Sequence, residues 1–417
     1  MFVDNKWLKF FDNIKRASFF VENYSVLKKK QNIRVKELLS IIPDDKISTL
    51  SASTNVDYCT KVLYGRSVFY MILYALLESD RASLRTMEDI FNSLKFKFLF
   101  NLDQNKTVRY SSISERLSVM DVGFFEKLFE LFHARLSSLY SEKELSEKKL
   151  VRVDSTMVAE ASNKLSQGMC VGRNNKIKQT KYTIGFDGLL PCSSEIYTDQ
   201  SSLSECLTIP DVIKKEVKKG NGNIYVFDRG VNSRDVFEDF QGKEIEFVTR
   251  LNPGAAYQSL RINDSQERML GNLKLIKDED VLLYTYGKSK KKQPTENSYR
   301  LITTENKDGE ILLFLTNIFD FPSEQITDFY RRRWDIEVFF RFIKQELSFS
   351  HFMSTNENGI KIILYMTLIL SMLILIYKRL NNIGFKTAKR RFAIELDELL
   401  IAMIVRFCGG DPSLVFR

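Results

Sequence analysis

The sequence has few of the residues that build metal sites from soft ligands or that cross-link secreted proteins. Among 417 residues there are two histidines and five cysteines. The cysteines stand at positions 59, 170, 192, 206 and 408, so none has the Cys-x-x-Cys spacing. This pattern argues against a structural zinc site and favours reduced thiols in a cytosolic protein. The N-terminal residues Met1 to Lys6 also lack the apolar core of a signal peptide.

The sequence also lacks an uncharged run long enough for a standard membrane helix. The longest apolar stretch considered, from Ile362 to Tyr377, is bounded by Lys361 and Lys378 and falls short of the roughly 20 residues that a span needs. We therefore expect no membrane association. The stretch is predicted to be a buried helix of the C-terminal core, packed against the predicted sheet or the helix that carries Glu337.

Basic residues outnumber acidic ones. The chain carries 62 Lys and Arg against 53 Asp and Glu, which gives a net charge of +9 and a pI near 9.0. A basic balance favours a polyanionic partner. The length is sufficient for two or three domains with a large core.

The segment from Tyr330 to Lys344 concentrates charged and aromatic side chains. If it is one helix, Tyr330, Arg333, Glu337 and Lys344 fall within about 60° of one another on a single stripe. Apolar side chains occupy the other faces: Ile326, Phe329, Trp334, Phe339 and Phe342. A carboxylate flanked by cations suits a divalent metal ion that faces phosphate oxygens. The alternative is an exposed face on which Arg333 and Glu337, spaced i to i+4, form an ordinary ion pair.

Two aspartates follow or interrupt runs typical of β-strands. Asp154 stands inside a predicted strand at 150–158, where aspartate is disfavoured. Asp228 ends an apolar run at 222–228 that is typical of a buried strand, and the end of such a strand borders the crevice where open α/β sheets bind ligands. Asp228 could instead cap a helix that begins near Asn232.

Together these residues resemble a known family. The order Asp154, Asp228, Glu337 is similar to the DDE transposases of bacterial insertion sequences. The Tyr-x2-Arg-x3-Glu-x6-Lys spacing of Tyr330, Arg333, Glu337 and Lys344 resembles the signature of insertion-sequence family four. The resemblance extends from about residue 60 to about residue 380.

The resemblance implies an RNase H-like α/β core, a mixed five-stranded sheet with helices. In such enzymes Asp154, Asp228 and Glu337 would hold two Mg²⁺ ions roughly 4 Å apart, and Mn²⁺ can substitute. Water cuts at the element's ends, and the exposed 3′-hydroxyl then attacks target DNA. Tyr330, Arg333 and Lys344 would contact phosphates. The implied partners are double-stranded DNA with terminal inverted repeats, target DNA and a second subunit in a synaptic homodimer, all in the bacterial cytoplasm at the nucleoid.

Five parts of the chain are predicted. Residues 1–149 form a helical domain that the resemblance assigns to inverted-repeat binding. The catalytic core takes 150–250 and 311–380, a β-rich insertion takes 251–310, and a helical tail with a possible dimer contact takes 381–417. Lys290, Lys291 and Lys292 lie in a basic loop of the insertion, which is either a solvated turn or a contact to the DNA backbone.

Relatives stack a flipped base on a tryptophan of the insertion while the DNA forms a hairpin. The tryptophans here are Trp7 and Trp334, so the insertion has none. Either an aromatic such as Tyr257 or Tyr284 replaces it, or the hairpin step differs. Two other functions stay open: a related nuclease or inactive copy, and a DNA-binding regulator without chemistry, which would not need the three acids.

Overall fold

The computed structural model describes residues 32–39, 41, 44–78, 82–99, 102–141, 144, 149–159, 165, 168–170, 177–217, 222–286, 292–347, 349 and 352–414. The chain forms two compact units. A helical unit comprises residues 1–141, 160–167 and 341–417, and a sheet unit comprises residues 142–159 and 168–340. The division differs from the predicted one, because residues 341–380 group with the N-terminal helices instead of with the sheet.

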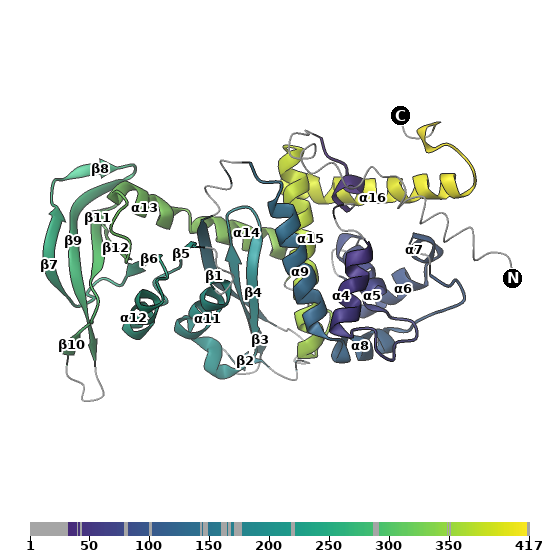
Figure 1. The fold of residues 1–417 in the computed structure, drawn as a ribbon, viewed down its shortest axis with the longest axis horizontal. Helices are drawn as coiled ribbons and strands as arrows, with labels where there is room; N and C mark the ends of the chain where they lie inside the picture. The colour runs from purple at the N-terminus through teal and green to yellow at the C-terminus, as the bar shows by residue number, and fades with distance from the viewer. Residues whose placement is uncertain are drawn as a thin grey trace. The chain divides into compact units, whose positions relative to one another are not determined.

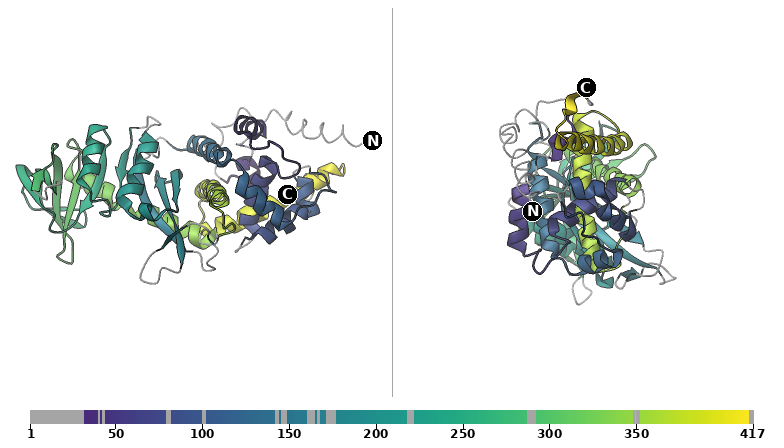
Figure 2. Two further views of the ribbon diagram at one scale, coloured as in Figure 1. Left: turned by 90° about the horizontal axis from the view of Figure 1, so that it is seen from below. Right: turned by 90° about the vertical axis from the view of Figure 1, so that its right-hand side faces the viewer.

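The helical unit is built around one long apolar helix, α15 (Glu357–Leu380). Its other elements are α3 (Val35–Leu39), α4 (Asp44–Thr54), α5 (Gly65–Glu78), α6 (Leu84–Asn92), α7 (Leu94–Leu99), α8 (Tyr110–Val119), α9 (Val122–Ser137), α16 (Phe385–Phe407) and the 3₁₀ turn η2 (Pro412–Leu414). In Figures 1 and 2, α15 (yellow-green) lies among N-terminal helices coloured purple to blue.

The burial predicted for the apolar run is confirmed. Among the described helices, α15 is the one long and apolar enough to cross a membrane, and most of its apolar stretch is buried inside the protein. Its main partners within the helical unit are α9, α16, α5 and α8, and packing against the sheet or the glutamate helix stays a prediction. The aromatic stripe of α9 explains this choice: Phe129 faces Tyr365 with ring centroids 5.8 Å apart.

The sheet unit contains one mixed sheet, made of twelve strands within the described residues. The strands are β1 (Leu150–Ala159), β2 (Met169–Cys170), β3 (Lys178–Phe186), β4 (Pro191–Tyr197), β5 (Ile224–Val226), β6 (Phe247–Leu251), β7 (Tyr257–Asp264), β8 (Arg268–Leu270), β9 (Leu273–Tyr286), β10 (Lys292–Pro294), β11 (Tyr299–Glu305) and β12 (Ile311–Thr316). The order is β10-β9-β11-β12-β6-β5-β1-β3-β2, and β4 pairs with β3 (Figure 1).

The helices of this unit are α11 (Glu205–Val217), α12 (Arg234–Gly242) and α13 (Ser323–Arg331), with the short turn η1 (Gln200–Leu203) before α11. Helix α14 (Trp334–Glu346) begins in the sheet unit and continues past residue 340. Strands β1, β3 and β4 run antiparallel, whereas β5 and β6 join β1 in parallel. The sequence pattern predicts strands at 150–158, 181–187, 190–198, 222–228 and 244–250, and a strand overlaps each of these ranges.

Asp187-Gly188 stands between two strand-like runs and predicts a hairpin, and the β3–β4 hairpin turns at these two residues. Gly188 has φ +101°, a conformation that side chains rarely adopt, and the Asp187 carboxylate accepts hydrogen bonds from the amides of Leu189 and Leu190 at 2.9 Å. The five-stranded sheet is a prediction that the structure corrects. The β-rich segment extends the same sheet, because β12 pairs with β6 on one side and with β11 on the other.

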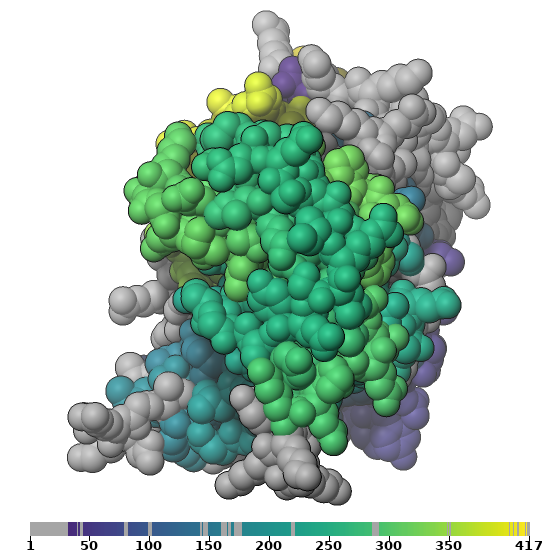
Figure 3. All heavy atoms as spheres, turned by 90° about the vertical axis from the view of Figure 1, so that its left-hand side faces the viewer, coloured from purple at the N-terminus to yellow at the C-terminus, as the bar shows by residue number. Residues whose placement is uncertain are grey.

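Strands β7 and β8 both pair with β9. Their outer surface lies in the foreground of Figure 3 as green spheres. Three apolar side chains on it are at least half exposed: Leu260, Ile262 and Met269. This surface is formed by the part of the chain predicted as the insertion.

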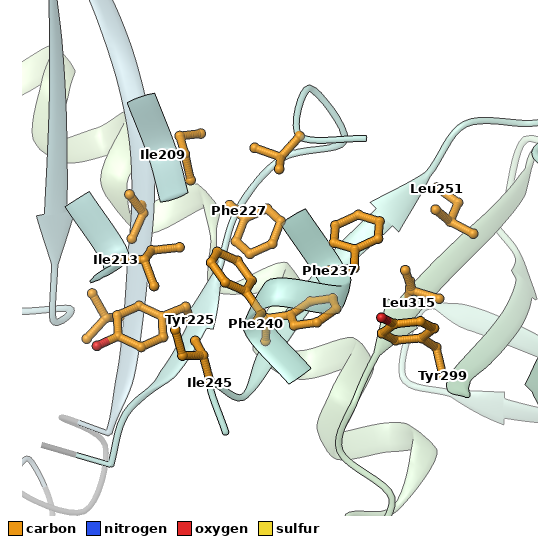
Figure 4. Close-up of a cluster of buried hydrophobic side chains, with 14 of the residues drawn as sticks. Ile209, Ile213, Tyr225, Phe227, Phe237, Phe240, Ile245, Leu251, Tyr299 and Leu315 are labelled. Carbon is orange, nitrogen blue, oxygen red and sulfur yellow. The ribbon is translucent and has the colours of Figure 1, made fainter. Parts of the chain in front are cut away.

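An aromatic core fixes the strand that leads to Asp228. Phe227 is fully buried and lies with Phe237 and Phe240 of α12 in the cluster drawn in Figure 4. Phe247 of β6 stacks on Phe237, with centroids 5.2 Å apart. Because successive side chains along an extended chain alternate in direction, burying Phe227 in this core directs Asp228 away from it.

Candidate active site

The segment predicted as one helix is broken. Helix α13 ends at Arg331 and α14 begins at Trp334, with a turn at Arg332 and Arg333. At the break the backbone bonds shorten to i→i−3: the Arg333 amide donates to the Tyr330 carbonyl at 2.9 Å and the Asp335 amide to the Arg332 carbonyl at 3.1 Å. The prediction of a continuous stripe from Tyr330 to Lys344 is therefore wrong.

Arg333 nevertheless connects two of the three predicted acids. Its guanidinium lies 2.5 Å from Glu337 Oε1 and 3.4 Å from Asp154 Oδ2. The ion pair with Glu337 is the one expected from i,i+4 spacing alone. The surroundings are not those of an ordinary exposed face, because the side chains of Arg333 and Asp154 are only 15% and 16% exposed.

Tyr330 holds the third acid. Its hydroxyl donates to Asp228 Oδ1 at 3.0 Å, and its ring meets Phe314 edge-on with centroids 5.4 Å apart. Burial, and next the negative charge of Asp228, raise the pKa of Tyr330 to about 12. The phenol therefore stays protonated as a donor at neutral pH. Asp228 does not cap the following helix, since α12 begins at Arg234 after Ser233.

Asp154 is the acid with the clearest electrostatic strain. Burial raises its pKa from 3.8 to about 6, and the charges of Glu205 and Asp228 add to the shift. The Ser155 amide, which donates to Asp154 Oδ1 at 2.7 Å, and the Arg333 guanidinium act in the opposite direction. Two neighbouring acids and partial burial make this position favourable for an additional cation.

The three acids come from β1, from the loop after β5 and from α14, and they are tied together through Arg333 and Tyr330. Their all-oxygen donor set fits a hard divalent cation. Within the described residues no group of three metal-ligating side chains is arranged to enclose an ion. Asp154 and Glu337 share Arg333 instead. The metal role of these acids stays a prediction that their chemistry supports.

Glu205 is a fourth acid near the site that the sequence analysis missed. It opens α11, and a Cβ added at Gly230 would lie 1.9 Å from its Oε2. Burial raises the pKa of Glu205, Lys181 lowers it and Asp228 raises it further. The glycine two residues after Asp228 is thus explained by the space that Glu205 occupies. Nothing in the sequence around Glu205 indicated this proximity.

Arg250 on β6 was also missed. Strands β5 and β6 run parallel with Val226 beside Val248, so Arg250 lies at the level of Asp228. Its guanidinium is 5.9 Å from the centre of the Tyr330 ring. Its Nε is buried without a hydrogen-bond partner in the described part of the protein. A charged residue inside the apolar run Phe247 to Leu251 is the same signal that singled out Asp154, and it could have identified Arg250.

The remaining predicted residues are Lys344 and the three lysines of the basic loop. Lys344 is on α14, two turns after Glu337 and past the residue at which the units divide. Lys292 begins β10 and lies over the ring of Tyr284, with its Nζ 4.1 Å from the centroid. Lys290 and Lys291 lie outside the described residues.

Residues 145–373, more than half of the chain, match the family described as "Transposase DDE domain". A protein of Sinorhizobium fredii named as transposase y4zB is 28% identical over 45% of this chain and 53% of its own length. A Geobacillus stearothermophilus protein named as the transposase of insertion sequence element IS5377 is 23% identical over 60% and 62%. The chain therefore spans between half and two thirds of these two relatives.

A Synechocystis protein named as the transposase of insertion sequence element IS4SA is 26% identical over 72% of this chain and 78% of its own length. Among solved structures, the cryo-EM structure of the piggyBac transposase synaptic complex with hairpin DNA is 13% identical. The match covers 90% of this chain and 82% of that one, with a TM-score of 0.46.

Proposed function

We propose that this chain, which belongs to the DDE transposases of insertion-sequence elements, cuts DNA at the two ends of such an element and joins the freed ends to target DNA. The observation that supports this most directly is the convergence of three acids from distant positions, each held by Arg333 or Tyr330. A regulator that only binds DNA would have no use for this arrangement.

DDE transposases use a divalent metal ion, and we infer that Asp154, Asp228 and Glu337 hold it here. Mg²⁺ is the expected ion and Mn²⁺ a substitute, because carboxylate oxygens suit both. When bound at these acids, such ions activate the attacking oxygen and stabilise the leaving one. Arg333 competes for the oxygens of Asp154 and Glu337, so metal binding would free its guanidinium for a phosphate.

The other residues of the site have separate roles in this reaction. Tyr330 keeps Asp228 oriented through its hydroxyl. Arg333 and Arg250 would offer positive charge to the phosphate at which the bond breaks, with Lys344 and Lys292 gripping the backbone further away. In the first step a water oxygen attacks phosphorus and the bond to the 3′-oxygen breaks, which leaves a 3′-hydroxyl. In the second step that hydroxyl attacks a target phosphorus and displaces the target's own 3′-oxygen.

The catalytic core is inferred to be RNase H-like. The supporting feature is the sheet order: antiparallel β1, β3 and β4, then a crossover through α11 to β5, which lies parallel to β1. Helices of the N-terminal part are proposed to bind the terminal inverted repeats. Two subunits are proposed to pair the ends in a synaptic homodimer. Tyr284, with Lys292 over its ring, is the candidate for stacking a flipped base in place of a tryptophan.

The test uses linear DNA that carries the inverted repeats flanking this reading frame. We expect the full-length protein to cut at the repeat ends in Mg²⁺ and not in EDTA. Glu337→Gln should lose cleavage and strand transfer while it still binds the DNA, because the amide lacks the charge that a hard cation needs. Glu346→Gln, the same change on the same helix, is the matched control and should cut normally.

Wild-type cleavage by Glu337→Gln would remove Glu337 from the site. Binding of the repeats without cleavage by the wild type in either Mg²⁺ or Mn²⁺ would favour the regulator. Cleavage without strand transfer would favour a related nuclease.

A further inference from the structure

Arg152 is a buried cation two residues before Asp154 on the same strand. Its side chain is 0% exposed. A charged group in such a place is costly unless its hydrogen bonds are satisfied. Here every nitrogen donates: Nε to the Arg332 carbonyl at 3.1 Å, one terminal nitrogen to the carbonyls of Leu150 at 2.6 Å and Asp187 at 3.0 Å, and the other to Asp335 Oδ2 at 2.8 Å.

The partners of Arg152 lie in three different elements. Leu150 belongs to β1, Asp187 to the β3–β4 turn, and Arg332 and Asp335 to the break between α13 and α14 and the first turn after it. Arg332 directly precedes Arg333, and Asp335 stands in the first turn of α14 with Glu337. Arg152 therefore joins the strand that carries Asp154 to the backbone that carries Arg333 and Glu337.

The hairpin turn is closed around the same guanidinium. A Cβ added at Gly188 would lie 2.8 Å from a terminal nitrogen of Arg152. The planar guanidinium presents its donors in a fixed fork, so one side chain can reach all three elements at once. A lysine has a single ammonium and could satisfy only part of this set.

We propose that Arg152 is a positioning residue that sets the separation of Asp154 from Glu337 by clamping the α13–α14 break to β1. The inference rests on the proposed function, since it assigns these two acids to one metal site. Arg152 need not touch metal or DNA in this role. Groups that orient metal ligands typically contribute about 10- to 100-fold in metal affinity.

A plain stabilising role is the alternative, and Arg300 provides a matched control. Arg300 is also buried in the sheet unit, and its partners are the Asp278 carboxylate, the backbone carbonyls of Phe319 and Phe321 and, at 3.4 Å, the Ser323 hydroxyl. These partners lie in β9, in the loop before α13 and at the first residue of α13, and none flanks a predicted acid. Loss of either arginine should lower thermal stability, but only loss of Arg152 should disturb the acids.

The experiment compares full-length wild type, Arg152→Lys and Arg300→Lys without DNA. Folding is checked by circular dichroism, and Mn²⁺ affinity is measured by calorimetry and by the spin resonance signal of free Mn²⁺ at a temperature below all three melting points. We expect both variants to melt earlier. We expect about 10-fold or greater weakening of Mn²⁺ binding in Arg152→Lys and wild-type affinity in Arg300→Lys.

Asp335→Asn supplies a milder variant if Arg152→Lys does not fold, because Arg152 keeps its three carbonyl partners. It should weaken Mn²⁺ binding less than the lysine variant but measurably. Wild-type Mn²⁺ affinity in the folded Arg152 and Asp335 variants, or an equal loss in Arg300→Lys, overturns the positioning role and leaves the metal site intact. Failure of the wild-type protein itself to bind Mn²⁺ overturns both this inference and the proposed function.

Discussion

Removing the charge of Asp154 should stabilise the metal-free protein while it abolishes the proposed chemistry. Burial raises the pKa of this carboxyl from 3.8 to about 6. At about 1.4 kcal/mol per pKa unit, the ionised form costs roughly 3 kcal/mol of folding free energy at neutral pH. Asp154→Asn avoids this cost and can still accept the Ser155 amide bond. It also loses the 3.4 Å contact with Arg333, but that attraction is already contained in the net pKa shift, so we expect a gain of about 3 kcal/mol.

The pH dependence of the stability difference shows whether the buried charge of Asp154 causes it. The folded-state pKa of Asp154 is raised, so its favourable neutral form is fully present below about pH 4, and the stability is lost as pH rises towards 6. The advantage of Asp154→Asn over wild type should therefore be near zero at pH 4, grow between pH 4 and 6, and stay constant above. The affinity of the wild-type protein for the metal ion should change in the opposite direction. It should weaken below about pH 6, because protons compete with the metal ion for the Asp154 carboxylate.

The assay is urea unfolding in EDTA at several pH values, followed by fluorescence of Trp334 in a Trp7→Phe background. Trp334 begins α14, next to Arg333, and so reports on this region. Asp328→Asn is the control, because Asp328 and its partner Arg331 are both exposed and the change should cost less than about 0.5 kcal/mol. An Asp154→Asn protein that is less stable than wild type at pH 7.5, or a difference that does not vary with pH, would refute the reasoning.

Three further changes probe the other contacts. Tyr330→Phe removes the bond to Asp228 and should slow single-turnover cleavage about 10-fold or more while it changes stability by only about 1 kcal/mol; an unchanged rate would show that Asp228 needs no such support. Arg333→Ala should weaken binding to the DNA ends and leave Mn²⁺ affinity equal or tighter, since the guanidinium competes for Asp154 and Glu337; calorimetry showing an equal loss of metal affinity would contradict this division of roles. Gly230→Ala places a Cβ 1.9 Å from Glu205 and should slow cleavage, and added Glu205→Ala should restore part of the rate; no restoration would place the strain elsewhere.

The sequence predicted the secondary structure around the site well, because its signals there are local. The strand before Asp228 is marked by apolar residues on both faces, and the β3–β4 hairpin by Asp187 and Gly188. The extent of the sheet could not be predicted in the same way. Whether β12 continues the catalytic sheet depends on its pairing with β6, a contact between residues 251 and 313 that no local pattern encodes.

The partners of α15 within the helical unit could not be predicted for a related reason. Its apolar residues correctly predicted burial, but an apolar surface does not specify its partner. Helix α15 packs on the aromatic stripe of α9, which is distant in the sequence and has an apolar surface that must also be buried. The pattern of apolar residues predicts that a helix is buried. Which element it packs against depends on the shapes of all the apolar surfaces that compete for burial.

The broken helix is the most instructive difference at the site. Helical periodicity grouped Tyr330, Arg333 and Glu337 correctly, yet it did so through a continuous helix that does not exist. The i,i+4 pair survives because the i→i−3 bonds at the break keep Arg333 one turn from Glu337, while the turn frees Arg333 to reach Asp154 on β1. The Arg332 carbonyl accepts both from the Asp335 amide within the turn and from Arg152 on β1. Part of what holds the break is therefore a residue 180 positions earlier in the chain, which no helical pattern near Arg332 could reveal.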